Sequence, residues 1–421
     1  MLGVGGGEFG TRRVIMYDLL KGLTVVEGSA FIAGPTCGLY LAQLGARVIR
    51  FDNIGGGPDF RRWPLAPGGA SLYWEGLNKG KQSVAIDLSR PEGRDLAQRL
   101  AAAPGPDAGL FVTNFPAAGF LSYDALRALR QDLICVRVMG WADEGPGVDY
   151  TINSAVGVPL MTGHPDDGRP VNHVLPAWDL LTGAFAAFNL VAALINRHRT
   201  GQGREIRIPL SDVAASALAN MGMTAEILAG AGERPRQGNT LFGAFGRDFL
   251  TRDGKRLMVV AITPRQWTGL IEVLGVGEAV AAVESARGVD FRKDEGLRYA
   301  HADALMPIFE AGFARADSAA LLPRFDELGV CWGPYQTLSE ALEDPRLFKD
   351  NPIFTELTQV SGARYPVAGY AATLPQDERR PPTPAPALGA HTEAVLADLL
   401  GLDGGEIARL HDAGVVASAG T

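Results

Sequence analysis

The stretch LTVVEGSAFIAGPTCGLYLAQLGARVIRF, residues 23–51, decides the fold. Its beginning, residues 22–27, is apolar and β-branched, which predicts a buried strand. A helix is expected to begin near Gly34 and to end at Gly45, because apolar side chains recur between them at helical spacing. The run RVIRF at residues 47–51 predicts a second strand. This order is typical of a βαβ unit, with parallel strands and a right-handed crossover.

The same alternation of strands and helices continues along the chain. Further strands are predicted at residues 83–88, 108–113, 133–138 and 205–208, and further helices at 90–103, 123–130, 180–198 and 211–229. Strands that alternate with helices form an open α/β sheet, and such sheets bind ligands beyond the carboxyl ends of their strands. We therefore expect a large domain with a Rossmann-like open parallel sheet. The helix at 180–198 is apolar on most faces and is expected to be buried.

A second, smaller α/β domain is expected after the large one. The turn-rich segment at residues 234–243 predicts a linker, and a strand is expected at 257–262. The Gly-rich start of the chain predicts a disordered extension. The expected division is a disordered N-terminal extension at 1–16, a large domain at 17–230 and 335–421, and a small domain at 240–330.

The composition is that of a globular enzyme. Of the 421 residues, 47% are hydrophobic and 20% are charged. The net charge of −8 argues against nucleic acid or an anionic membrane as a partner, so an anionic ligand must be met by local cations. The three cysteines lack CxxC spacing, and no apolar run is expected to span a bilayer. These features predict a cytoplasmic protein with no metal site.

The segment PAWDLLTG at residues 176–183 places Asp179 at the start of the predicted apolar helix. One interpretation is structural, because aspartate is a preferred N-cap residue. The other is a carboxylate nucleophile, which the helix N-terminus should keep ionised near neutral pH. A carboxylate that attacks a thioester forms a mixed anhydride and releases a thiolate. Gly183 is expected to leave room for the substrate.

Two groups of residues could bind phosphate. The triple glycine at 55–57 follows the second strand, where a flexible turn is the plain alternative to a phosphate-binding loop, and it lacks the GxGxxG spacing of a dinucleotide site. Lys79 and Lys81 precede a strand, with Arg61 and Arg62 upstream. Such a basic cluster suits the phosphates of CoA, although it could equally be a solvated charged face.

Taken in order, several segments resemble the family III CoA-transferases over residues 20–416. They are LKGLTVVEGSAFIAGP, LAQLGARVIRFD, GLNKGKQSVAIDL, LFVTNFP, the Asp179-to-Gly183 pattern, RDFLTRDGKRLMVV and the Asp344-Pro345 segment. The resemblance implies that Asp179 is the catalytic nucleophile and that two subunits interlock as a homodimer. It also implies that CoA, as part of the substrate, lies along the large domain and that no further cofactor is needed.

The resemblance further implies a set of binding residues. The CoA-binding candidates are Phe31, Ile32, Arg50, Leu77, Lys81, Asn114 and Phe115. The candidate cations for a substrate carboxylate are Arg247 and His173, and Arg50 could also serve there. This chain departs from the family pattern after Phe115, because the stretch PAAGFLSYD lacks the arginine expected there.

Other phrases resemble one branch of the family, including FDNIGGGPDFRRWP, VNHVLPAWD and AFGRDF. That branch moves CoA between the two carboxyl groups of one methyl-branched unsaturated dicarboxylic acid, in the 3-hydroxypropionate bicycle or a related assimilation route. An intermolecular CoA-transferase, an acyl-CoA racemase and a non-catalytic CoA-binding protein remain alternatives. Racemases of this superfamily have a histidine where Val148 stands, before Asp149, and racemisation needs a base on each face of the carbon. Asp149 is therefore expected to be structural.

Overall fold

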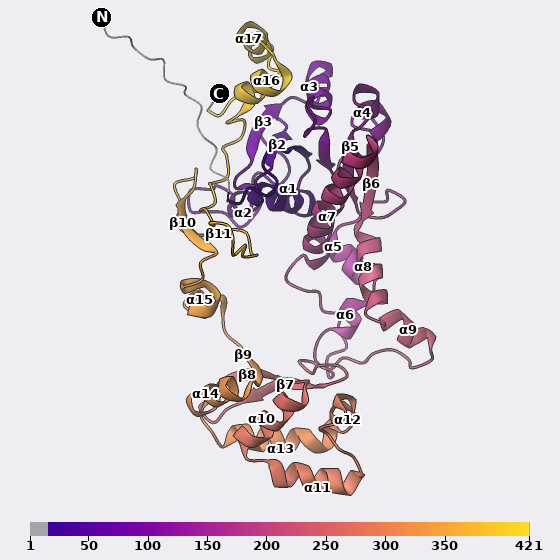
Figure 1. Ribbon diagram of the computed structural model, residues 1–421, viewed down its shortest axis with the longest axis vertical. Coiled ribbons are helices and arrows are strands. Elements are labelled where there is room, and N and C mark those ends of the chain that lie inside the picture. The colour runs from indigo at the N-terminus through magenta and orange to yellow at the C-terminus, as the bar shows by residue number, and fades with distance from the viewer. Residues whose placement is uncertain (1–15, 421) are drawn as a thin grey trace, which may run out of the picture. The chain divides into compact units, whose positions relative to one another are not determined.

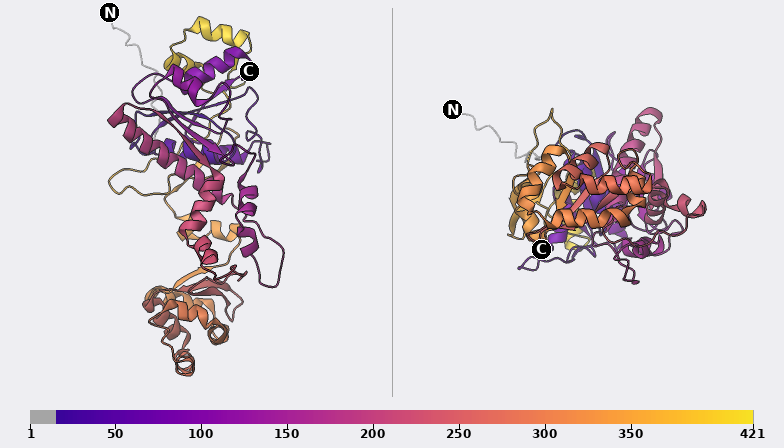
Figure 2. Two further views of the ribbon diagram at one scale, coloured as in Figure 1. Left: turned by 90° about the vertical axis from the view of Figure 1, so that its right-hand side faces the viewer. Right: turned by 90° about the horizontal axis from the view of Figure 1, so that it is seen from below.

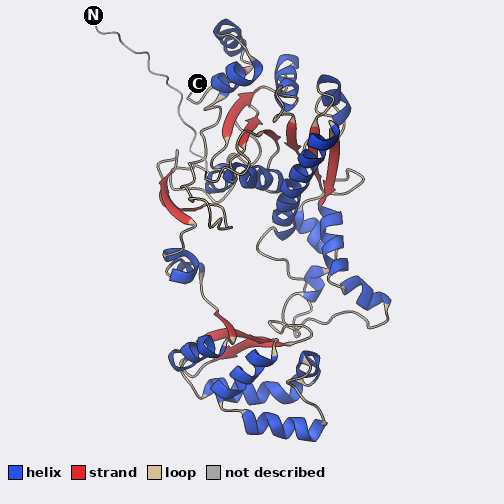
Figure 3. Cartoon of the chain, viewed as in Figure 1, coloured by secondary structure: helices blue, strands red, loops and turns tan. Residues whose placement is uncertain are grey.

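The computed structural model describes residues 16–420, and the chain divides into two units. The larger unit comprises residues 16–156, 173–228 and 352–420, and the smaller unit comprises 157–172 and 229–351. Figures 1 and 3 show both units as layers of strands and helices. Residues 1–15 of the predicted extension lie outside the described residues. Met16 does not belong to a disordered segment, since its carbonyl accepts a hydrogen bond from the Arg380 N–H.

A seven-stranded sheet forms the centre of the larger unit, in the order β12-β3-β2-β1-β4-β5-β6. Its strands are β1 (Thr24–Gly28), β2 (Arg47–Asp52), β3 (Gln82–Ile86), β4 (Leu110–Thr113), β5 (Ile134–Met139), β6 (Arg204–Pro209) and β12 (Val416–Ala417). All neighbours pair in parallel except β12, which runs antiparallel to β3. The predicted Rossmann-like sheet is confirmed, and its order reverses between β1 and β4.

Alternate residues of the strands enter two different cores. Val25 packs into the core under α1 (Ala33–Gln43) and α7 (Ala177–Thr200), whereas Val26 packs into the core under α3 (Pro91–Ala101) and α16 (Thr392–Leu400). Successive side chains of a strand point to opposite faces, so both faces of the sheet need a cover of helices. The long helix α7 runs along one of these faces (Figures 1 and 2). The other elements of this unit are α2 (Leu72–Asn78), α4 (Tyr123–Leu129), α5 (Asp149–Ala155), α8 (Leu210–Asn220), α9 (Met223–Leu228), α17 (Gly404–Asp412) and the hairpin β10–β11 (Phe354–Thr358, Arg364–Ala368).

The smaller unit packs helices against a three-stranded antiparallel sheet. Its strands are β7 (Phe245–Leu250), β8 (Arg256–Ala261) and β9 (Cys331–Pro334). Its helices are α6 (Val158–Met161), α10 (Pro264–Leu274), α11 (Gly277–Arg287), α12 (Glu295–Ala300), α13 (Ala302–Ala314), α14 (Ser318–Leu328) and α15 (Leu338–Leu342), with a short π-helix, η1, at Pro345–Lys349. The core is aromatic, with Trp267, Phe309 and Phe313 fully buried.

The boundaries of the predicted domains were wrong at two places. Residues 157–172 belong to the smaller unit, where the Arg236 side chain donates to carbonyls of this segment, including that of Leu160 at 2.9 Å. Residues 335–351 also belong there, since the Tyr335 N–H donates to the Arg256 carbonyl at 2.9 Å beside β9. The predicted linker at 234–243 is likewise part of this unit. These contacts join segments that are distant in sequence, so local patterns did not reveal them.

Two predicted helices also differ from those observed. The helix expected at 211–229 is broken into α8 and α9, because Gly222 adopts a positive φ of 77° that a helix interior excludes. The predicted apolar helix, α7, begins at Ala177, and only one of its faces is buried. Leu181, Phe185 and Phe188 are exposed on the other face. Among the described residues, α7 is long and apolar enough to cross a membrane by length and composition alone. No apolar run of that length was expected from the sequence.

Gly183 has a packing role rather than the predicted role of leaving room for substrate. A Cβ at this position would lie 2.7 Å from the Thr36 Cβ and 2.8 Å from the Ala33 carbonyl oxygen. The glycine therefore lets α7 approach α1 closely. This contact fixes the start of α7 relative to the loop that precedes α1.

We expect Gly183→Ala to destabilise the protein by about 1–3 kcal/mol, because the added methyl overpacks the α1–α7 contact. The matched control is Gly76→Ala in α2, where a Cβ meets nothing within 4 Å. That control should be neutral or stabilising by about 0.5–1 kcal/mol. Thermal unfolding followed by circular dichroism measures both, and equal stability of the two variants would contradict the packing role.

Candidate active site

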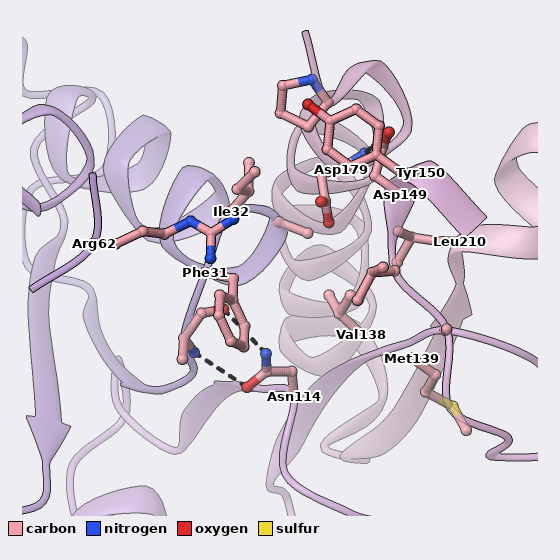
Figure 4. A pocket seen from close by; sticks show the side chains of 16 residues that line it. Phe31, Ile32, Arg62, Asn114, Val138, Met139, Asp149, Tyr150, Asp179 and Leu210 are labelled. Carbon is pink, nitrogen blue, oxygen red and sulfur yellow. Dashed lines mark hydrogen bonds between the residues drawn. The ribbon is translucent and has the colours of Figure 1, made fainter. Parts of the chain in front are cut away.

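A cavity of about 530 Å³ opens beyond the carboxyl ends of β1, β4 and β5. It lies at the point where the strand order reverses, which is where open α/β sheets bind ligands. Figure 4 labels ten of the side chains that line it. They are Phe31, Ile32, Arg62, Asn114, Val138, Met139, Asp149, Tyr150, Asp179 and Leu210. The cavity therefore contains the predicted nucleophile and three of the predicted CoA-binding residues.

The loop after β1 forms one wall of the cavity. Its backbone is held by Asn114, whose amide donates to the Ala30 carbonyl at 3.0 Å and accepts from the Ala30 N–H at 3.2 Å. The next residue, Phe31, has a positive φ of 70°, which is uncommon for a residue with a side chain. The buried Asp59 accepts the Phe31 N–H at 3.1 Å. Side chains from two other segments thus hold a backbone conformation that the local sequence does not favour.

Asp179 occupies the first turn of α7, but it does not cap the helix. The carboxylate of Asp149 accepts the backbone N–H groups of Trp178 at 2.7 Å and Asp179 at 3.1 Å. Asp149 is 1% exposed and begins α5, so the cap comes from a separate helix. Among the described residues, the Asp179 carboxylate has no hydrogen-bond partner. Its oxygens are therefore available for chemistry in the cavity.

The electrostatic environment of Asp179 differs from the sequence-based expectation. Burial and, to a smaller extent, the nearby Asp149 carboxylate raise the pKa of Asp179 to about 7, against the opposing charge of Arg62. The expected stabilisation of the anion by the helix N-terminus fails because Asp149 already accepts the free N–H groups there. Near neutral pH, the Asp179 carboxyl group is thus divided between its ionised and protonated forms.

Arg50 and Lys81 lie outside the cavity, so the structure does not support them as CoA-binding residues. Arg50 is 1% exposed, and its guanidinium donates to Asp52 and Asp59 at 2.8–2.9 Å. The Lys81 amine donates to Glu27 at 2.8 Å and to Asn78 at 2.9 Å. Buried charges need such partners, and these carboxylates neutralise both cations. Two of the cations that were predicted to bind CoA are thus paired inside the domain.

Three other predicted residues also lie away from the cavity lining. Leu77 is half-buried in α2, and Phe115 packs against the rings of Phe51 and Phe120. His173 contacts Asp149, with its Nε2 atom 2.7 Å from Oδ1. It therefore positions Asp149, which caps α7, and does not line the cavity.

Arg247, the other predicted substrate cation, belongs to the smaller unit. Its guanidinium lies 3.2 Å from the Glu310 carboxylate and 5.8 Å from the Phe249 ring. It lines a second cavity, of about 810 Å³, together with Arg256, Tyr335 and other polar residues.

Three residues of the cavity were missed as site residues by sequence reasoning. Arg62 appeared only as part of a basic cluster, Asp149 only as a structural residue, and Tyr150 not at all. All three lie in segments that follow strands of the parallel sheet. Arg62 lies between β2 and α2, and Asp149 and Tyr150 come after β5. Loops after parallel strands converge at one edge of the sheet, but sequence alone does not tell which of their side chains turn inward.

Comparison with known proteins agrees with this geometry. The model of CoA-transferase family III matches residues 20–392. The chain belongs to this family. It is 46% identical over 404 residues to 2-methylfumaryl-CoA isomerase from Chloroflexus aurantiacus, a match that covers 96% of this chain and 98% of the relative. The family predicted from the sequence is confirmed.

Other relatives carry the names of CoA-transferases. The chain is 30% identical to succinate–glutarate CoA-transferase from Agrobacterium fabrum, over 90% of this chain and 95% of the relative. Among solved structures, a CAIB/BAIF family protein from Brucella suis matches with a TM-score of 0.72 and 27% identity. That match covers 91% of this chain and 100% of the other, so the family fold extends over almost the whole molecule.

Asp149→Asn should move the ionisation of Asp179 to lower pH. The change removes a like charge next to Asp179 while an amide oxygen can still accept the N–H groups of α7, so the pKa of Asp179 should fall below about 7. Burial should keep it above the ordinary range of aspartate. Groups that also act on Asp179 or Asp149, namely Arg62, Tyr73 and His173, are unchanged.

The pH dependence of acyl transfer to Asp179, followed by hydroxylamine trapping, measures this shift. Because only the ionised carboxylate attacks, the wild-type signal should rise as pH increases through about 7, and the Asp149→Asn signal should rise earlier. Asp95→Asn on the surface of α3 is the control and should leave the profile unchanged. An unchanged profile for Asp149→Asn would show that Asp149 does not set the charge of the nucleophile.

Proposed function

We propose that this chain is an intramolecular CoA-transferase that converts 2-methylfumaryl-CoA (mesaconyl-C1-CoA) to 3-methylfumaryl-CoA (mesaconyl-C4-CoA). The observation that carries the proposal is the unpartnered Asp179 carboxylate in a cavity at the switch point of the sheet. The 46% identity to 2-methylfumaryl-CoA isomerase over nearly the full chain supports this particular reaction. Both carboxyl groups belong to one acid, so no second acid and no cofactor beyond CoA are needed.

The first half of the reaction moves the acyl group and then CoA onto Asp179. A carboxylate oxygen of Asp179 attacks the C1 thioester carbonyl, the C–S bond breaks, and a mixed anhydride and CoA thiolate form. The thiolate then attacks the aspartyl carbonyl of the anhydride. The C–O bond breaks, which leaves an aspartyl-CoA thioester and the free dicarboxylate. Each step exchanges one leaving group for another and needs no net proton.

The second half repeats these steps at the other end of the acid. The C4 carboxylate attacks the aspartyl-CoA carbonyl and expels CoA thiolate, which gives the second anhydride. The thiolate attacks the C4 carbonyl, and Asp179 leaves as a carboxylate. The dicarboxylate must stay in the cavity throughout, because its loss would make the transfer intermolecular. The cavity must therefore hold the acid while it is bound to neither CoA nor Asp179.

We further propose that two copies of the chain form an interlocked homodimer in the cytoplasm. The exposed apolar side chains of α7, Leu181, Phe185, Phe188 and Ile195, support a covered face in the assembly. Two of the three free cysteines are buried, which is compatible with a reducing compartment. A place in the 3-hydroxypropionate bicycle or a related carbon-assimilation route follows from the proposed substrate.

Asp179→Ala should lower the rate of isomerisation by about 10³-fold or more, because no other group can form the acyl intermediates. Mass spectrometry of hydroxylamine-treated enzyme should find the adduct on Asp179 after exposure to the acyl-CoA, and none in the variant. Asp124→Ala, an acid on α4 outside the cavity lining, is the control and should keep full activity. An active Asp179→Ala enzyme would refute the covalent route.

Isotope labelling separates the intramolecular reaction from ordinary CoA transfer between two acids. Unlabelled mesaconyl-C1-CoA is incubated with labelled free mesaconate, and the product thioester is analysed by mass spectrometry. We expect no label in the product, because the acid never leaves the cavity. Label at the level of free exchange would assign the chain to the intermolecular transferases, whose names several relatives carry.

A further inference from the structure

The cavity holds one cation that the steps above do not use. Arg62 lines the cavity, and Figure 4 shows its guanidinium and the Asp179 carboxylate pointing into the same space from different sides. The two groups form no ion pair within 4 Å, yet the positive charge of Arg62 lowers the pKa of Asp179. A small molecule can therefore lie between them.

The backbone of Arg62 is held firmly in place. Its N–H donates to the Asp59 carbonyl at 3.2 Å, and its carbonyl accepts from the Ser71 hydroxyl. The Asp59 carboxylate in turn joins Arg50 in the buried core to the Phe31 N–H in the cavity wall. The segment that carries Arg62 is thus tied both to the sheet and to the loop beside the nucleophile.

The side chain of Arg62, in contrast, has no anionic partner. Among residues 16–420, no carboxylate oxygen lies within 4 Å of its guanidinium. The group rests instead against two aromatic rings, at 5.5 Å from the centroid of Phe31 and 5.5 Å from that of Tyr73. Two other cations of this region, Arg50 and Lys81, form ion pairs with buried acids. Arg62 is a positioned cation whose charge is left for a ligand.

We propose that Arg62 binds the second carboxylate of the acid, the one that is bonded neither to CoA nor to Asp179. Arg62 would thereby select dicarboxylic acids. This inference rests on the proposed function. A planar guanidinium can bind a carboxylate through two parallel hydrogen bonds. A four-carbon diacid carries its carboxyl groups a few ångströms apart, so one can react at Asp179 while the other pairs with Arg62.

This role also accounts for retention of the acid during the reaction. When the acid is free, either of its carboxylates can pair with Arg62 while the other faces the aspartyl-CoA thioester. Exchange of the two ends then needs rotation within the cavity and no release. Tyr73 does not line the cavity, but its ring lies beside the Arg62 guanidinium. Its buried hydroxyl lacks a hydrogen-bond partner among the described residues, and burial raises its pKa to about 12, so it stays protonated.

Binding of two acyl-CoA probes tests the proposal without any chemistry. Succinyl-CoA and butyryl-CoA both carry four-carbon acyl groups, and only succinyl-CoA has a distal carboxylate. Their dissociation constants are measured by calorimetry in the Asp179→Ala background, so that no covalent step contributes. Adding Arg62→Ala should raise the dissociation constant of succinyl-CoA about tenfold or more, and that of butyryl-CoA less than about twofold. Arg62→Lys, which keeps the charge but loses the planar fork, should fall between.

The outcomes separate the possible roles of Arg62. Equal weakening of both probes would mean that Arg62 binds the CoA moiety, and no change for either would mean that it binds no ligand; each result overturns the proposal. Arg61→Ala is the matched control, because this neighbouring arginine is exposed, as Arg62 is, but does not line the cavity. Isomerase activity of the wild type is assayed separately, so failure of the proposed function does not mimic failure of the binding test.

Discussion

The hydrogen bonds from the start of α7 to Asp149 are the contacts on which the site depends. One oxygen of the Asp149 carboxylate accepts the N–H groups of Trp178 and Asp179, and His173 contacts the other oxygen. This arrangement leaves the Asp179 carboxylate without a partner and close to a second negative charge. Together with burial, which has the larger effect, the Asp149 charge raises the pKa of this carboxyl to about 7. A less basic carboxylate would be a poorer nucleophile toward a thioester, so the cap and the reactivity are coupled.

The buried charges under the cavity have a complementary role. Buried ion pairs join Glu27 to Arg50 and Lys81, and join Arg50 to Asp59, whose carboxylate also accepts the Phe31 N–H. Because these charges are fully buried, their value lies in fixing geometry more than in net stability. Through Asp59 they hold the left-handed backbone of Phe31 and the turn before Arg62. A cluster that the sequence offered as a CoA clamp instead builds the wall of the cavity.

These two networks divide the charges of the larger unit into structural and available groups. Arg50, Lys81, Asp59 and Asp149 are buried and paired. Asp179 and Arg62 have no ionic partner among the described residues and share the cavity. Asp179 can carry a negative charge and Arg62 a positive one. This pair suits the proposed dicarboxylate, one end of which reacts at Asp179 while the other is bound by Arg62. The division follows from burial, which penalises any charge without a partner.

The sequence by itself determined the βαβ pattern, the parallel sheet and the family, and it singled out Asp179 as a candidate, because each is recorded in local periodicity or in contiguous motifs. Only the tertiary structure decided which carboxylate caps α7 and which cations remain free. Asp149 and Asp179 are 30 residues apart, and Arg50 and Arg62 have the same side chain in one short stretch of sequence. What separates them is which acids lie beside each after folding, and that depends on long-range contacts that no local pattern records.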